Sequence, residues 1–216
     1  ATQANEDAKQ LQDVQAESID AINAMTHLTQ EQKDAFISKI NESNIISEVK
    51  STLANAVTEN KLAEAKANAV SAIDALTHLS EQEKTRLKDK VAAAKADDAI
   101  PTIVSDAKTR NALVGLQNDA IANIMALTYI SADQKADFVA QIKATNTASA
   151  IKPISDAATK AESDAKELRE AKDAALETAK GYTHVSDVIK TKATTAIEAA
   201  TSKDDVAKLI ANLKVE

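Results

Sequence analysis

The feature that most constrains this chain is a nine-residue stretch that recurs along it. The stretch reads MTHLTQEQK at 25–33, LTHLSEQEK at 76–84 and LTYISADQK at 127–135, and a more divergent copy, YTHVSDVIK, occupies 182–190. The first three copies start 51 residues apart, and the fourth starts 55 residues after the third. A fixed period of this length is typical of tandem arrays of small units. The sequence therefore predicts four structural repeats.

The composition indicates what kind of repeat this is. The 216 residues include only two Gly and two Pro, so turns and helix breakers are rare. Aromatic residues make up 2% of the chain, which leaves Ala, Ile, Val and Leu to build thin cores between closely packed helices. Because the composition also favours helix, we predict an all-α fold.

Each repeat is predicted to hold three helices. The first carries apolar residues at helical spacing, as at Ile19, Ile22 and Met25. A turn follows, and then a Ser or Thr with Gln or Glu three residues later, the capping-box pattern that opens a helix. This pattern recurs at Thr29 and Gln32, Ser80 and Glu83, and Ser131 and Gln134. The second helix is expected to face the core with Phe36 and Ile40, Leu87 and Val91, or Phe138 and Ile142.

The links between repeats are predicted to be helical. No Gly or Pro lies between residues 47 and 76, so the third helix of one repeat should run directly into the first helix of the next. Gly115 lies in the second link without having to break it. The third link is four residues longer, about one helical turn, and its charged stretch, 159–171, should be a solvent-exposed bridge.

We therefore expect a tandem array of four three-helix bundles joined by long shared helices, forming an elongated rod. The expected repeats are 1–58, 59–109, 110–160 and 161–216.

The charge pattern and the residue types exclude several classes of function. The net charge is −7 and the charges are interspersed, which argues against a nucleic-acid partner and against attraction to anionic lipid. No apolar run is long enough for membrane insertion, and the absence of Cys removes disulfides and thiolate metal sites. We find no phosphate-binding loop and no arrangement of nucleophile and base. We predict no enzyme activity, no catalytic residue, no cofactor and no metal site.

Three histidines occupy one repeat position, His27, His78 and His184, and Tyr129 takes their place in the third copy. No second potential ligand recurs beside them, so a packing or turn role is favoured over metal binding.

A lysine also recurs, as Lys33, Lys84, Lys135 and Lys190. These lysines could form a basic row for an acidic partner; the favoured interpretation is that each is a solvated residue paired with a nearby acid.

The fourth repeat differs from the others at the start of its second helix. Val188 and Ile189 stand where the third repeat has Asp133 and Gln134. An exposed apolar pair at this position would be a contact site. The alternative is that the helix is slightly rotated and buries one of the two, since this repeat has also lost its capping box.

The motifs together resemble a known family. The stretch 121–135, IANIMALTYISADQK, is similar to the GA-module/FIVAR three-helix repeats of giant extracellular-matrix-binding (Ebh-type) surface proteins of Gram-positive cocci. The fourth repeat resembles the albumin-binding GA domain, with Val188 and Ile189 at the place of an aromatic pair that touches albumin. Lys203 lies in the stretch similar to that domain's entry to its third helix. The resemblance implies Val188, Ile189 and Lys203 as candidate binding residues.

The same resemblance implies a function. We expect a piece of a secreted, cell-wall-anchored surface protein, a monomeric adhesin and stalk that spans distance from the wall and binds a host matrix or serum protein of the fibronectin or albumin class. The alternatives are a pure spacer without a ligand and an accessory stalk of a secreted glycoside hydrolase.

The predicted rod can be tested by small-angle X-ray scattering. We expect a maximum dimension far beyond that of a compact globule of 216 residues, because shared helices would hold successive bundles apart. A compact scattering profile would contradict the rod.

Overall fold

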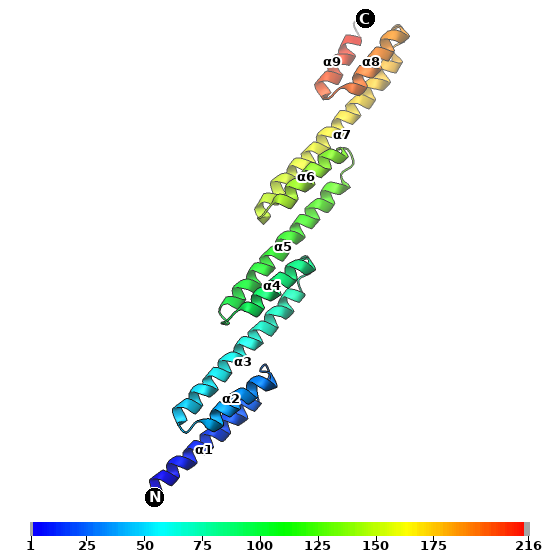
Figure 1. Ribbon diagram of the computed structural model, residues 1–216. Coiled ribbons are helices and arrows are strands. Elements are labelled where there is room, and N and C mark those ends of the chain that lie inside the picture. Colours follow the sequence, from blue (N-terminus) through cyan, green and yellow to red (C-terminus); the bar gives the residue numbers. More distant parts are fainter. Residues whose placement is uncertain (1, 214–216) are drawn as a thin grey trace. The chain divides into compact units, whose positions relative to one another are not determined.

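The computed structural model describes residues 2–213, and every regular element in this range is a helix (Figure 1). By its contacts the chain divides into two compact units, Ala1–Ala112 and Leu113–Glu216. Each unit contains two hydrophobic cores. The all-α prediction is confirmed; the four repeat boundaries and the rod stay predictions.

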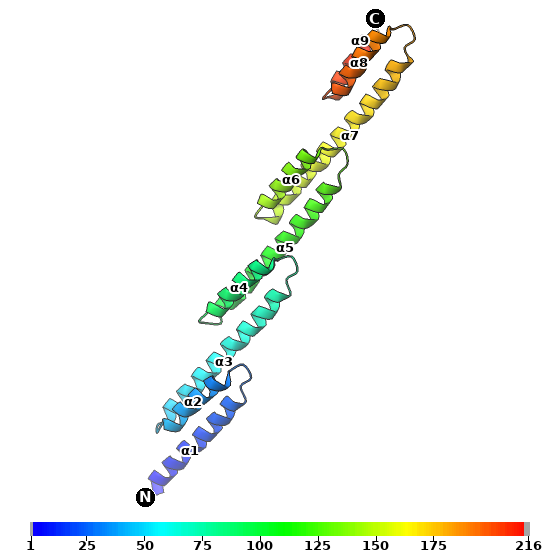
Figure 2. The same ribbon diagram turned by 45° about the vertical axis from the view of Figure 1, so that its right-hand side comes forward.

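The first unit is built from α1 (Thr2–Asn23), α2 (Gln30–Glu42), α3 (Ile46–Asp74), α4 (Glu81–Ala93) and the first part of α5 (Ala99–Ala126). Helix α2 packs against both α1 and the first half of α3, and it lies beside them in both views (Figures 1 and 2). Helix α4 packs against the second half of α3. The first core is centred on the fully buried Ile22, Ile40 and Val49, and the second on Ile73 and Val91.

The second unit repeats this arrangement. It contains the rest of α5, then α6 (Ala132–Ala144), a short 3-10 turn (Ala148–Ala150), α7 (Ile151–Gly181), α8 (Asp187–Ala199) and α9 (Lys203–Leu213). Ile124, Ile142 and Ile151 lie in the third core, and Ile197 and Val206 in the fourth. The second helix is 13 residues long in all four bundles.

The three long helices each supply two cores, as the sequence predicts. Val49 and Ala56 of α3 lie in the first core, and Ala69 and Ile73 of the same helix lie in the second. Helix α7 likewise gives Ile151 and Ala158 to the third core and Ala175 and Ala179 to the fourth. Helix α5 contributes Ile100 and Ala107 to the second core and Leu113, Ala120 and Ile124 to the third. Neighbouring cores are thus connected by helix and not by loop.

The unusual residues in the links fit within these helices. Helix α5 continues through Gly115, whose position is buried. Pro101 and Pro153 are each the third residue of their helix, where the backbone N–H of any other residue would lack an intrahelical partner. The charged stretch of α7 is mostly exposed and carries ion pairs one helical turn apart, such as Lys160 with Asp164 at 2.7 Å. The four extra residues are therefore absorbed as helix.

Breaking a shared helix should affect two cores at once. Ala63→Pro in the middle of α3 removes a backbone hydrogen bond and introduces a clash, which costs about 3 kcal/mol or more. We expect thermal unfolding, followed by circular dichroism and by amide exchange, to show loss of both the first and the second core. Ser47→Pro, in the first turn of the same helix, is the matched control and should be tolerated. Loss of only one core in Ala63→Pro would contradict the coupling.

Candidate partner-binding surface

The turn between the first and second helices is held by side chains in every bundle. Its end is the N-cap of the second helix, and the predicted capping boxes are present at Thr29, Ser80 and Ser131. In each box the cap oxygen accepts a bond from the backbone N–H three residues on, and the side chain there accepts one from the cap N–H. Ser186 in the fourth bundle keeps only the first of these bonds, because Ile189 has no acceptor to return.

The recurring lysine has a different role from the one expected. Lys33 donates from Nζ to the backbone oxygen of Asn23 at 2.9 Å, and Lys84 and Lys135 donate in the same way to Asp74 and Met125, each at 3.2 Å. All three acceptors are carbonyls at the end of the first helix, where the helix dipole favours a cation. Pairing with a nearby acid is seen for Lys84, with Glu81 at 3.1 Å. The interpretation as solvated surface residues was wrong for these three, which are half-buried and tie the second helix to the first.

The third helix supplies an acceptor to the turn, which the sequence analysis missed. The backbone N–H of His27 donates to Asn60 Oδ1 at 3.0 Å, and that of His78 donates to Asn111 Oδ1 at 2.8 Å. In the third bundle Glu162 stands at this position. The signal was present in the sequence, because Asn60, Asn111 and Glu162 recur with the same 51-residue spacing as the turns.

Glu162 binds its turn more extensively than the asparagines do. Its carboxylate accepts hydrogen bonds from the backbone N–H groups of Thr128, Tyr129 and Ile130 at 2.7, 2.8 and 3.0 Å, and another from the Thr128 hydroxyl. Partial desolvation acts to raise the pKa of Glu162, but the three backbone donors outweigh it and the pKa is lowered. The turn of the third bundle is therefore a formed carboxylate-binding loop.

A second missed position closes the other end of the short helix. Gln15 donates to the carbonyls of Ile40 and Ser43, both at 2.9 Å, and Gln117 donates to those of Ile142 and Thr145. The same repeat position holds lysine in the other two bundles, where Lys66 donates to Ala92 O and Lys172 to Glu198 O at 2.8 Å. Each donor satisfies carbonyls left free at a helix end.

The histidine position contributes to the turn through its backbone. His27, His78, His184 and Tyr129 all have exposed side chains, and no ring of this set is buried in a core. The turn role holds for His27, His78 and Tyr129, whose N–H groups donate to the third helix. Within residues 2–213 no three His, Cys, Asp or Glu side chains gather as a metal site would require.

The fourth bundle separates the two apolar residues singled out in the sequence. Val188 is 66% exposed, whereas Ile189 is half-buried and packs against the fourth core. Ile189, Ala193 and Leu209 also line a shallow groove between α8 and α9. The single apolar side chain that this helix start presents to solvent is therefore Val188.

Lys203 is the first residue of α9 and its Nζ pairs with Glu167 of α7. The hydrogen bond and charge of Glu167 raise the pKa of Lys203, and Lys203 in turn lowers the pKa of Glu167. This pair links the first and third helices of the fourth bundle. Lys203 thus has an internal partner, unlike the exposed Val188.

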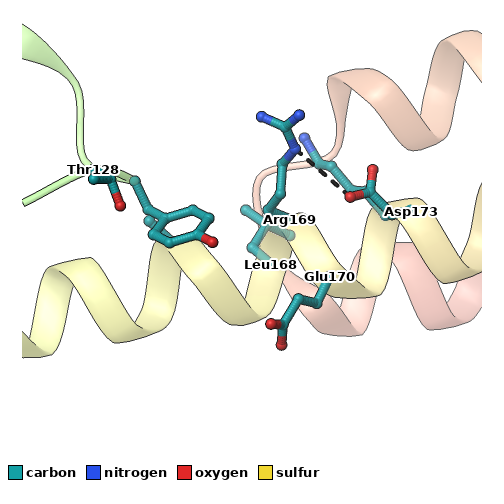
Figure 3. A pocket seen from close by; sticks show the side chains of 8 residues that line it. Thr128, Leu168, Arg169, Glu170 and Asp173 are labelled. Carbon is teal, nitrogen blue, oxygen red and sulfur yellow. Dashed lines mark ion pairs between the residues drawn. The ribbon is translucent and has the colours of Figure 1, made fainter.

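A hollow in the second unit lies between the turn of the third bundle and α7. It measures about 640 Å³ and is lined by Thr128 and Tyr129 of the turn and by α7 (Figure 3). Arg169 points toward Asp173, with Nε 3.7 Å from Oδ2, while Glu170 extends from the other side of the helix (Figure 3). The second cation of the hollow, Lys172, donates to the backbone oxygen of Glu198. No described helix is both long and apolar enough to cross a membrane.

Comparison with known proteins gives four family matches and a set of bacterial relatives. The GA module family matches residues 8–58, 59–112, 116–163 and 165–214. The chain is 42% identical over 93 residues to the extracellular matrix-binding protein ebh of Staphylococcus aureus strain MRSA252, covering 41% of this chain. It is 35% identical over 118 residues, 53% of this chain, to EbhA of strain Newman. These segments amount to 1% and 3% of the two relatives.

A solved structure, the crystal structure of an EbhA domain from Staphylococcus aureus, aligns over 94% of this chain and 98% of its own, at 20% identity and a TM-score of 0.47.

The carboxylate in the third turn should make that turn sensitive to acid. Because folding lowers the pKa of Glu162, its stabilisation is present above the ordinary pKa of 4.5 and is lost as pH falls through the lowered value. We expect the protection of the Tyr129 amide from hydrogen exchange to fall over this range, while that of His27, bound by a neutral asparagine, does not follow it. Glu162→Gln is the control and should remove the pH dependence. Equal acid responses at Tyr129 in both proteins would contradict this assignment.

Proposed function

This chain belongs to the GA module family, and from that premise we propose that it is a segment of a bacterial surface protein, displayed at the cell wall, that acts as a stalk and binds a host matrix or serum protein. The relatives named extracellular matrix-binding proteins support a partner in the matrix. Because the chain spans only 1–3% of these relatives, their activity is carried over to it as part of the proposal.

The shared helices support the stalk role. A loop between two domains allows them to reorient, whereas a continuous helix transmits force and position from one core to the next. Helix α3 is 29 residues long and α7 is 31, each about 45 Å at 1.5 Å per residue, and each belongs to two cores. Segments joined in this way suit a protein that must hold a binding surface away from the cell wall.

The exposed Val188 supports a binding role for the fourth bundle. The corresponding residues of the other bundles are Glu31, Gln82 and Asp133, all polar and all exposed. From this helix start it is Ile189, and not Val188, that packs against the fourth core. An apolar side chain that does not serve its own core is available to a partner, and burying one adds about 1.5–3 kcal/mol to binding.

The proposal can be tested with immobilised fibronectin and serum albumin. We expect the native chain to bind one of them and Val188→Asp, which installs the residue found in the third bundle, to bind about tenfold more weakly or worse. Its melting temperature should not change, because the side chain is exposed. Val57→Asp, the same change at an exposed valine of α3, is the matched control and should retain binding.

If the native chain binds neither protein, the spacer without a ligand of its own becomes the better account of this segment. If the native chain binds and Val188→Asp binds as tightly as Val57→Asp and the native chain do, the contact does not involve Val188.

A further inference from the structure

One stretch of α7 lies between two hydrophobic cores without packing against either. Nine residues, 159–167, separate Ala158 of the third core from Leu168, which packs against the fourth. In α3 the corresponding gap, between Ala56 of the first core and Leu62 beside the second, is only five residues. We call residues 159–167 the α7 link. Its extra turn therefore has to be held by something other than a core.

Ion pairs along the helix support the α7 link. Lys160 Nζ lies 2.7 Å from Asp164 Oδ2, one helical turn away. Lys166 Nζ lies 3.8 Å from Glu170 Oε1 at the same spacing. Pairs of opposite charge four residues apart stabilise a helix that has little other support. Within α3, whose residues are all described, no ion pair joins two side chains of the helix, so this kind of support is particular to the longer link.

Two carboxylates fasten the α7 link to the bundles on its two sides. Glu162 accepts hydrogen bonds from three backbone N–H groups of the turn in the third bundle, at 2.7 to 3.0 Å. Glu167 pairs with Lys203 of the fourth bundle, and both side chains of this pair are about half exposed. The contacts that hold the link are thus charged and close to solvent, where dissolved ions can screen them.

The hollow beside the α7 link leaves space into which the helix can move. It measures about 640 Å³ and has Ala165 of the link in its wall (Figure 3). Thr128 and Tyr129 line it from the turn, and Leu168 lines it from the helix. Because close-packed side chains resist displacement and open space does not, α7 is less constrained on this side than a helix packed in a core.

We propose that the α7 link is a salt-sensitive joint between the third and fourth bundles. Its helix is held by ion pairs and opens when dissolved ions screen them, while both neighbouring cores stay folded. The screening length falls from about 10 Å at 0.1 M salt to about 3 Å at 1 M, which weakens exposed ion pairs far more than apolar packing. The joint is a property of α7 and does not depend on the proposed binding of a host protein.

Hydrogen exchange of the backbone amides can test the joint, at about 20 mM and about 1 M sodium chloride. We expect the amides of the α7 link to exchange about threefold faster at the higher concentration, because several weak pairs are screened together. Residues 57–61 of α3 should change little. Ile142 and Ile197, which are buried in the two neighbouring cores, should also keep their protection.

A pair of matched variants locates the effect. Asp164→Asn removes one ion pair of the link and should speed its exchange about twofold at low salt, with a smaller response to added salt. Asp156→Asn is the control, because the pair of Lys152 with Asp156 has the same spacing and a similar length, 2.8 Å. That pair lies between Ile151 and Ala158 of the third core, so its loss should leave the link as in the native chain.

Equal salt responses of the α7 link and of residues 57–61 would overturn the proposal, since salt would then act on the two shared helices alike. The same holds if Asp156→Asn loosens the link as much as Asp164→Asn does. Loss of protection at Ile142 or Ile197 together with the link would also overturn it, because a whole bundle would then be opening and not a joint.

Discussion

A helix that belongs to two hydrophobic cores cannot slide or rotate without disturbing both of them. Helices α3 and α7 are in this position, with Val49 and Ile73, or Ile151 and Ala179, packed at their two ends. Because protein cores are close-packed, a shift that suits one core leaves voids or clashes in the other. The spacing between the two cores that α3 joins, and between the two that α7 joins, is therefore fixed by helix length. The four extra residues in the last link are tolerated because they add about one full turn.

The short second helix of each bundle belongs to one core only, so it is not held in place by a second core as the shared helices are. Its 13 residues end within one bundle, so all of its terminal N–H and C=O groups need partners there. A capping box satisfies its start in the first three bundles and a single Ser186 cap in the fourth, and its end is satisfied from the first helix by Gln15, Lys66, Gln117 or Lys172. The chemistry of the donor varies between amide and ammonium while the geometry is kept. This position of the first helix therefore requires a side chain that can donate a hydrogen bond and is long enough to reach the last carbonyls of the second helix.

In the turn between the first and second helices, it is the hydrogen-bond acceptor from the third helix that varies while its position is kept. Asn60 and Asn111 provide one oxygen each, whereas Glu162 provides a charge and binds three backbone donors and the Thr128 hydroxyl. The bundles are thus alike in their cores and differ in the polar groups around them. Val188 is a difference of another kind, since among the described residues it is 66% exposed and belongs to none of the four cores. Such a residue is free to serve recognition, while the repeated contacts hold the bundle that presents it.

The sequence by itself determined the period, the three-helix plan, the capping boxes and the continuity of the shared helices. These features depend on contacts a few residues apart, so spacing and residue type reveal them directly, as for Thr29 with Gln32. Only the tertiary structure decided the partners that lie 10 to 36 residues away, as for Lys33 with Asn23, Gln15 with Ser43 or Lys203 with Glu167. It also decided which of Val188 and Ile189 faces solvent, because the rotation of α8 is set by packing against the fourth core and not by the helix's own sequence.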